Sequence, residues 1–102
     1  MPNSSFIIKI MRIVGEIPHP IIKITVFKND GKFSMKCETG LLEQMYKFRD
    51  DERLQSFEDL QNIVDQAFIQ KIEETMQVMY EAKKEGMQRH LTQIEDEFEK
   101  II

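Results

Sequence analysis

The sequence predicts an α+β domain: a three- to four-stranded antiparallel β-meander followed by a long C-terminal helix. Two patterns carry this prediction. Apolar and polar residues alternate over residues 21–38, on both sides of an Asn-Asp-Gly turn signal. From residue 57 onward the apolar spacing lengthens to three and four, and no proline follows. With 102 residues, of which 41% are hydrophobic, the chain has the size and composition of one globular domain.

The isoleucine-rich residues 6–14 are expected to form the fourth strand of the sheet. Residues 15–20 are expected to end that strand, because they contain a glycine and two prolines. Proline fixes φ, lacks an amide donor and holds the preceding residue extended. The Ile-Pro-His-Pro segment is therefore expected to be an extended connector that leads into the next strand.

The remaining three strands are expected over residues 21–28, 33–38 and 41–49. Asn29-Asp30-Gly31 and Thr39-Gly40 supply turn residues between them. Side chains in a strand point alternately to opposite faces, so every second residue should share the core face. Ile22, Ile24 and Val26 share one face, as do Phe33, Met35 and Cys37, and these are the expected core residues. In residues 41–49 the phase stays open: Leu42, Tyr46 and Phe48 share a face with Gln44, and Leu41 and Met45 lie on the opposite face with Glu43, Lys47 and Arg49.

Ser56 is expected to cap a helix, and Asp59 completes a capping box three residues later. A single helix over residues 57–100 would be about 65 Å long at 1.5 Å per residue, which exceeds the length of the sheet. The chain is therefore expected either to turn near Lys83–Gly86 or to project beyond the sheet. We expect one α+β domain over residues 5–85 and an amphipathic helical tail over residues 86–102.

The tail carries an apolar stripe with the 4-3-4-3 spacing that is typical of a coiled-coil seam. On a straight helix this stripe would lie on a different side from the apolar residues at 57–68. One interpretation is a short second helix that folds back on the domain. The other is self-association or binding of a protein partner. The predicted partner-binding residues are Met87, Leu91, Ile94, Phe98 and Ile101.

Charge is unevenly distributed along the chain. Residues 1–49 carry eight Lys or Arg and four Asp or Glu, whereas residues 50–102 carry six and fourteen. This asymmetry indicates either a basic binding face or an acidic helix packed on a basic sheet. An alternative function is binding of RNA or single-stranded nucleic acid through Lys23, Phe27 and Lys36 on the outer face of the sheet. The net charge of −4 favours a protein partner over nucleic acid.

No pattern of catalytic, metal-binding or cofactor-binding residues stands out, so we expect a protein that is not an enzyme. Cys37 is the single cysteine, which excludes an internal disulfide and a cysteine-based zinc site. The four glycines do not cluster as a phosphate-binding loop requires. No run of about 18 apolar residues predicts a membrane span, and no signal peptide is recognisable, so we expect a cytoplasmic location.

His19 lies between two prolines, and two interpretations remain open for it. The first is that it forms part of the corner before a strand, with its side chain exposed or at the rim. The second is that it belongs to a site. In that case it should line a pocket with acidic or aromatic residues close by.

Residues 15–48 resemble a family of small bacterial proteins to which no function is attached. The matching positions are Glu16–Pro20, Lys23–Thr25, Phe27, Asn29, Lys32, Glu43–Gln44, Tyr46–Lys47 and Phe68–Ile69. The resemblance covers residues 11 to 84 and implies a bacterial, cytoplasmic setting and the fold outlined above. It also implies that Met11 is the usual start, which would make residues 1–10 an extension.

Overall fold

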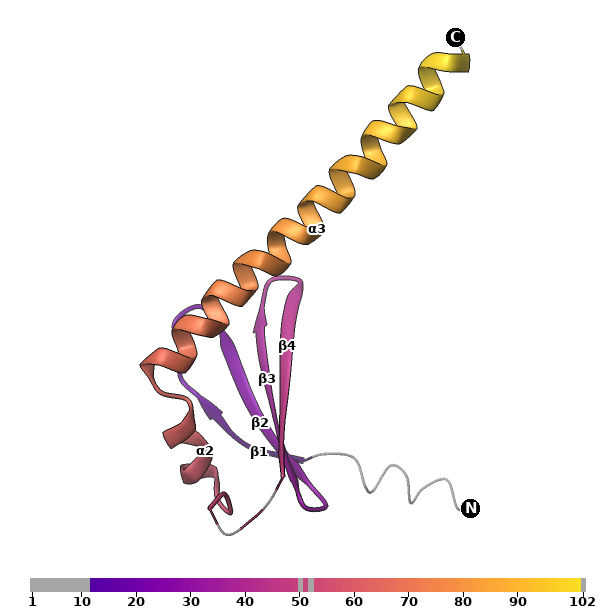
Figure 1. Ribbon diagram of the computed structural model, residues 1–102. Helices are drawn as coiled ribbons and strands as arrows, with labels where there is room; N and C mark the ends of the chain where they lie inside the picture. The colour runs from indigo at the N-terminus through magenta and orange to yellow at the C-terminus, as the bar shows by residue number, and fades with distance from the viewer. Residues whose placement is uncertain (1–11, 50, 52, 102) are drawn as a thin grey trace, which may run out of the picture.

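The computed structural model describes residues 12–49, 51 and 53–101, and of Ile101 it describes the backbone only. Four strands form one antiparallel sheet in the order β1-β2-β3-β4, and two helices follow (Figure 1). This confirms the predicted α+β class with a meander and a long helix. The elements are β1 (Arg12–Ile17), β2 (Lys23–Asn29), β3 (Lys32–Thr39), β4 (Leu42–Arg49), α2 (Phe57–Ile63) and α3 (Gln66–Ile101).

The sheet has the register that the alternation predicts. Val26 of β2 pairs with Met35 of β3, and Met35 pairs with Tyr46 of β4. Gly31 and Gly40 lie in the two hairpin turns with φ of 64° and 59°, a conformation that residues with a Cβ rarely adopt. The turns therefore set the register, and the register places the apolar set on one face.

Both helices lie on the same side of the sheet and cover this apolar face (Figure 1). Ile24, Met35 and Cys37 are fully buried there, as are Leu60 of α2 and Ile72 of α3. Burying such side chains contributes about 1.5–3 kcal/mol each. The core thus joins the sheet to α2 and to the first turns of α3.

The first strand differs from the prediction. Residues 6–11 lie outside the described residues, and β1 continues through Gly15 to Ile17 instead of ending at Val14. A bulge interrupts its pairing with β2 between Ile13 and Gly15. A Cβ on Gly15 would lie 2.6 Å from Cζ of Phe57, so the glycine permits close packing of α2 rather than a turn. The prediction was wrong because it treated Gly15 as a strand breaker.

The start of α2 is as predicted. The backbone N–H of Asp59 donates to Oγ of Ser56 at 3.1 Å, and the backbone N–H of Ser56 donates to Oδ2 of Asp59 at 3.1 Å. This reciprocal pair is a capping box, which satisfies amides that have no partner inside the helix.

The helical region has a break that the sequence did not predict. The chain turns at Val64 and Asp65, between α2 and α3, and α3 continues through Gly86 without interruption. Asp65 begins the new helix, because its Oδ1 accepts a hydrogen bond from the backbone N–H of Phe68 at 2.9 Å. This break also explains why the apolar residues at 57–68 and those in the tail were predicted to lie on different sides of one straight helix. The residues at 57–68 belong largely to α2, whose direction differs from that of α3.

The C-terminal half of α3 projects far beyond the sheet (Figure 1). The radius of gyration is 19.5 Å, compared with about 13 Å for a compact domain of this length. Of the two alternatives for the tail, the structure therefore has the projecting one. Among the described residues, no helix is both long and apolar enough to cross a membrane.

Candidate functional site

The candidate site is the projecting part of α3 together with a groove where the helix leaves the sheet. The helix is held at its other end by burial of Ile72 and Met76. The side-chain amide Nε2 of Gln44 adds a hydrogen bond to the carbonyl oxygen of Ile72 at 3.0 Å, and the hydroxyl of Tyr46 donates to Oε1 of Gln44. These contacts fix the position and rotation of α3 on the sheet.

The predicted partner-binding side chains lie on one exposed face of the projecting segment. Their exposed fractions are 52% for Met87, 51% for Leu91, 47% for Ile94 and 63% for Phe98. Ile101 belongs to α3, and its side chain lies outside the described residues. We call Met87, Leu91, Ile94 and Phe98 the apolar stripe.

The apolar stripe continues the face by which α3 packs on the sheet. With 3.6 residues per turn, Ile72, Met76, Met87 and Ile94 fall within an arc of about 60° around the helix. Met76 is buried against the core, whereas Met87, three turns later, has passed the end of the sheet. The stripe is thus the sheet-facing side of α3 where no described residue of the same chain covers it.

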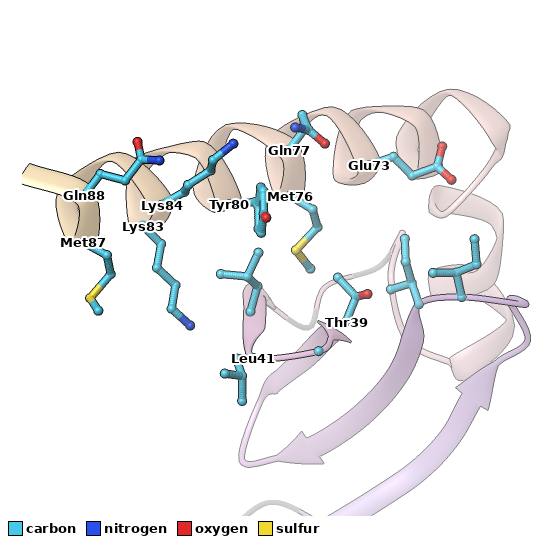
Figure 2. A pocket seen from close by; sticks show the side chains of 14 residues that line it. Thr39, Leu41, Glu73, Met76, Gln77, Tyr80, Lys83, Lys84, Met87 and Gln88 are labelled. Carbon is cyan, nitrogen blue, oxygen red and sulfur yellow. The ribbon is translucent and has the colours of Figure 1, made fainter. Parts of the chain in front are cut away.

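A groove of about 750 Å³ lies between α3 and the end of the sheet. Lys83 and Met87 point from α3 toward the turn that carries Leu41 (Figure 2). Two large apolar side chains on the sheet side are unusually exposed, Leu41 at 89% and Ile21 at 72%. The lining of the groove includes Ile21, Leu41, Met76, Tyr80, Lys83 and Met87.

This groove was not predicted from the sequence. Tyr80 precedes Met87 by seven residues and so extends the heptad spacing, which was an available signal. Ile21 is out of phase with Ile22, Ile24 and Val26, and Leu41 sits in a turn. Their meeting with Tyr80 depends on the path of α3, which no local pattern encodes.

The side chain of His19 is largely buried rather than exposed. Its side chain is 14% exposed, and Nδ1 accepts hydrogen bonds from the backbone N–H groups of Ile21 at 3.1 Å and Ile22 at 3.0 Å. In the neutral ring Nε2 therefore carries the proton, and it lies 3.8 Å from Oε2 of Glu73. His19 thus shapes the corner before β2 and positions Ile21 at the groove.

The residues predicted for nucleic-acid binding share the outer face of the sheet. Nζ of Lys36 lies 5.7 Å from the centre of the Phe27 ring and 3.6 Å from Oε1 of Glu38. Lys23 lies opposite Glu38 in the register of β2 with β3. Both lysines thus lie near the carboxylate of Glu38, and Lys36 lies over the ring that would have to stack on a base.

Cys37 lies in the core, as its apolar alternation predicted. It is fully buried, and this burial raises the pKa of its thiol to about 11. Within residues 12–49, 51 and 53–101 no group of three or more His, Cys, Asp or Glu side chains is placed to hold a metal ion.

Comparisons with known proteins give no further lead. A scan of family models, a search of curated proteins and a search of solved structures each find no match. The geometry of α3 and its groove is therefore the basis for the function proposed below.

Proposed function

We propose that this protein is a small, non-enzymatic interaction protein that self-associates through the apolar stripe of α3. The observation that carries the proposal is the stripe itself. Four large apolar side chains at coiled-coil spacing stand about half exposed on a helix that extends past its own domain. Contiguous exposed apolar surface of this kind is typical of interaction sites.

The energetics favour burial of the stripe in a partner. Complete burial of one such side chain contributes about 1.5–3 kcal/mol. A dimer would bury the exposed part of eight such side chains, four from each chain. An isolated helix that projects into water gains none of this. The sequence expectations of a cytoplasmic and bacterial setting belong to the same proposal.

The test is the mass of the protein in solution, measured by size-exclusion chromatography with light scattering at tens of micromolar. We expect a dimer for the unchanged protein and a monomer for Leu91→Ser/Ile94→Ser. The matched control is Val78→Ser, because Val78 is 64% exposed on the opposite side of α3. Circular dichroism verifies that all variants fold. A monomeric unchanged protein would refute the proposal.

RNA or single-strand binding through Lys23, Phe27 and Lys36 is the alternative. The placement of Lys23, Phe27 and Lys36 on one face of the sheet supports it, since basic residues and stacking aromatics on a sheet are typical of modules that bind single strands. Binding to single-stranded RNA at 50 mM salt that weakens at higher salt would favour this function. No binding at that salt concentration would eliminate it.

A further inference from the structure

We propose that two copies of this chain pair antiparallel through α3, so that the end of each α3 enters the groove beside Leu41 of the other. This inference rests on the proposed self-association and adds the orientation and the occupant of the groove. Three independent observations support it: the side of α3 on which the sheet lies, the distribution of charge along α3, and the continuity of the stripe with the groove.

The side of the sheet excludes the parallel arrangement. The apolar stripe and the sheet lie on the same side of α3, as Met76 and Met87 illustrate. Paired helices have axes about 8–10 Å apart. In a parallel pair, both sheets would have to fit between residues 68–80 of the two helices. One sheet layer alone occupies about 10 Å. In an antiparallel pair the sheets lie at opposite ends and do not meet.

Charge along α3 also favours the antiparallel arrangement. Residues 83–90 carry Lys83, Lys84 and Arg89 against one carboxylate, whereas residues 95–102 carry four carboxylates against one lysine. An antiparallel pair with Leu91 opposite Ile94 of the second copy places each basic block against an acidic block. A parallel pair places the acidic blocks side by side, where like charges repel.

The same register brings the end of the second α3 to the Leu41 end of the groove. Met87 lies opposite Phe98 of the second copy, and the last helical turn of the second copy then reaches Lys84 and the turn at Leu41. This explains why Leu41 is left exposed near Lys83 (Figure 2). The end of the second α3 matches the groove in two ways. Its apolar Phe98 lies opposite Met87, and its acidic residues lie near Lys83 and Lys84.

The first experiment measures orientation with a spin label on Val78→Cys. In the proposed register the two labels are separated by about 29 helical residues, or about 44 Å along the axis at 1.5 Å per residue. A parallel pair places them less than about 30 Å apart, since only two helix diameters separate them. The unchanged protein is the labelling control, because the buried Cys37 should not react. A short distance in a dimer overturns the inference and leaves the proposed self-association intact, whereas a monomer overturns both.

The second experiment tests the groove through Leu41→Ser. We expect the dissociation constant of the dimer to rise at least fivefold, because Leu41 contacts the second copy without belonging to the stripe. Ile13→Ser is the matched control, since Ile13 is 63% exposed on the outer face of the sheet, and we expect less than a twofold change. An unchanged constant for Leu41→Ser would show that the groove is empty or holds another segment, such as residues 1–10, and would refute its assignment.

The third experiment reverses charge. Glu95→Lys/Glu97→Lys should weaken the dimer at least tenfold, because two basic blocks would then face each other. Adding Lys83→Glu/Lys84→Glu should restore the affinity. Stronger association after the first pair of changes would identify a parallel arrangement, in which the substitutions relieve repulsion between neighbouring acidic blocks.

Discussion

Gln44 and Ile72 join the sheet to the long helix: Nε2 of Gln44 donates a hydrogen bond to the carbonyl oxygen of Ile72 at 3.0 Å. Gln44 is a buried polar residue on an otherwise apolar face, and its Oε1 accepts a hydrogen bond from the Tyr46 hydroxyl. Both ends of its amide are thus satisfied, which is the condition under which a buried polar side chain is tolerated.

We expect Gln44→Ala to lower the free energy of unfolding by about 1–3 kcal/mol, because it leaves the Tyr46 hydroxyl without its acceptor inside the protein. Urea unfolding monitored by circular dichroism measures the change. Glu43→Ala is the control at the adjacent, exposed position and should change stability by less than about 0.5 kcal/mol. Equal stability of the two variants would show that Gln44 does not anchor α3.

The contact of Gly15 with Phe57 leads to a second prediction. Gly15→Ala places a Cβ 2.6 Å from the Phe57 ring, so the ring and α2 must move. We expect a loss of about 1–3 kcal/mol, as for other overpacked sites. In Gly86→Ala the new Cβ makes only an ordinary contact, 3.7 Å from an Arg89 nitrogen, and alanine should stabilise the helix by about 0.5–1 kcal/mol. Thermal melts of the two variants should therefore shift in opposite directions.

His19 provides a third prediction. His19→Ala removes the acceptor of two backbone N–H groups, those of Ile21 and Ile22, and should cost about 1–2 kcal/mol. His19→Asn should recover part of this, since an asparagine oxygen can accept from the backbone two residues on. If alanine and asparagine behave alike and match the unchanged protein, the side chain does not stabilise the corner.

Asp59 predicts how stability depends on pH. Hydrogen bonds from the backbone N–H of Gln55, at 2.9 Å, and from the hydroxyl and backbone N–H of Ser56 lower the pKa of Asp59 below its usual 3.8. A carboxyl with a lowered pKa stabilises the fold above the unfolded value of 3.8, and this contribution is lost as the pH falls further. In Asp59→Asn we expect the melting temperature to fall less steeply below pH 4.

The control for Asp59 is Glu58→Gln, which removes the neighbouring negative charge and leaves the capping box in place. Its melting temperature should keep the acid dependence of the unchanged protein. Some dependence should remain in Asp59→Asn as well, because the backbone N–H of Arg53 lowers the pKa of Asp51 in the same way. Identical pH profiles for Asp59→Asn and the unchanged protein would contradict the prediction.

Local patterns in the sequence were sufficient for the sheet and for the start of α2. The alternation of Ile22, Ile24 and Val26 fixes which face is buried, and the Ser56 capping box is a short-range arrangement. The break at Asp65 could not be predicted from apolar spacing. Leu60, Val64 and Phe68 keep a spacing of four across it, and no glycine or proline marks it. Only the ability of Asp65 to cap a helix was a signal.

The candidate site was likewise predicted only in part from the sequence. The stripe from Met87 to Phe98 was predicted because its spacing is visible along one helix. The groove was not, because Ile21 and Leu41 come from two separate connections of the sheet and meet Tyr80 only in three dimensions. The contacts of His19 could not be predicted for a related reason, since its partners are backbone N–H groups and Glu73 of a helix distant in the sequence.

Because α3 is continuous through Gly86, the direction in which the stripe faces relative to the sheet depends on the number of helical residues between them. One residue inserted between Lys83 and Met87 would rotate the stripe by about 100° and turn it away from the side on which Leu41 lies. Seven inserted residues would return it to within about 20° while moving it about 10 Å outward. The helix thus fixes both the angle and the distance of the stripe relative to the sheet, and an insertion preserves that angle only where its length is close to a whole number of helical turns.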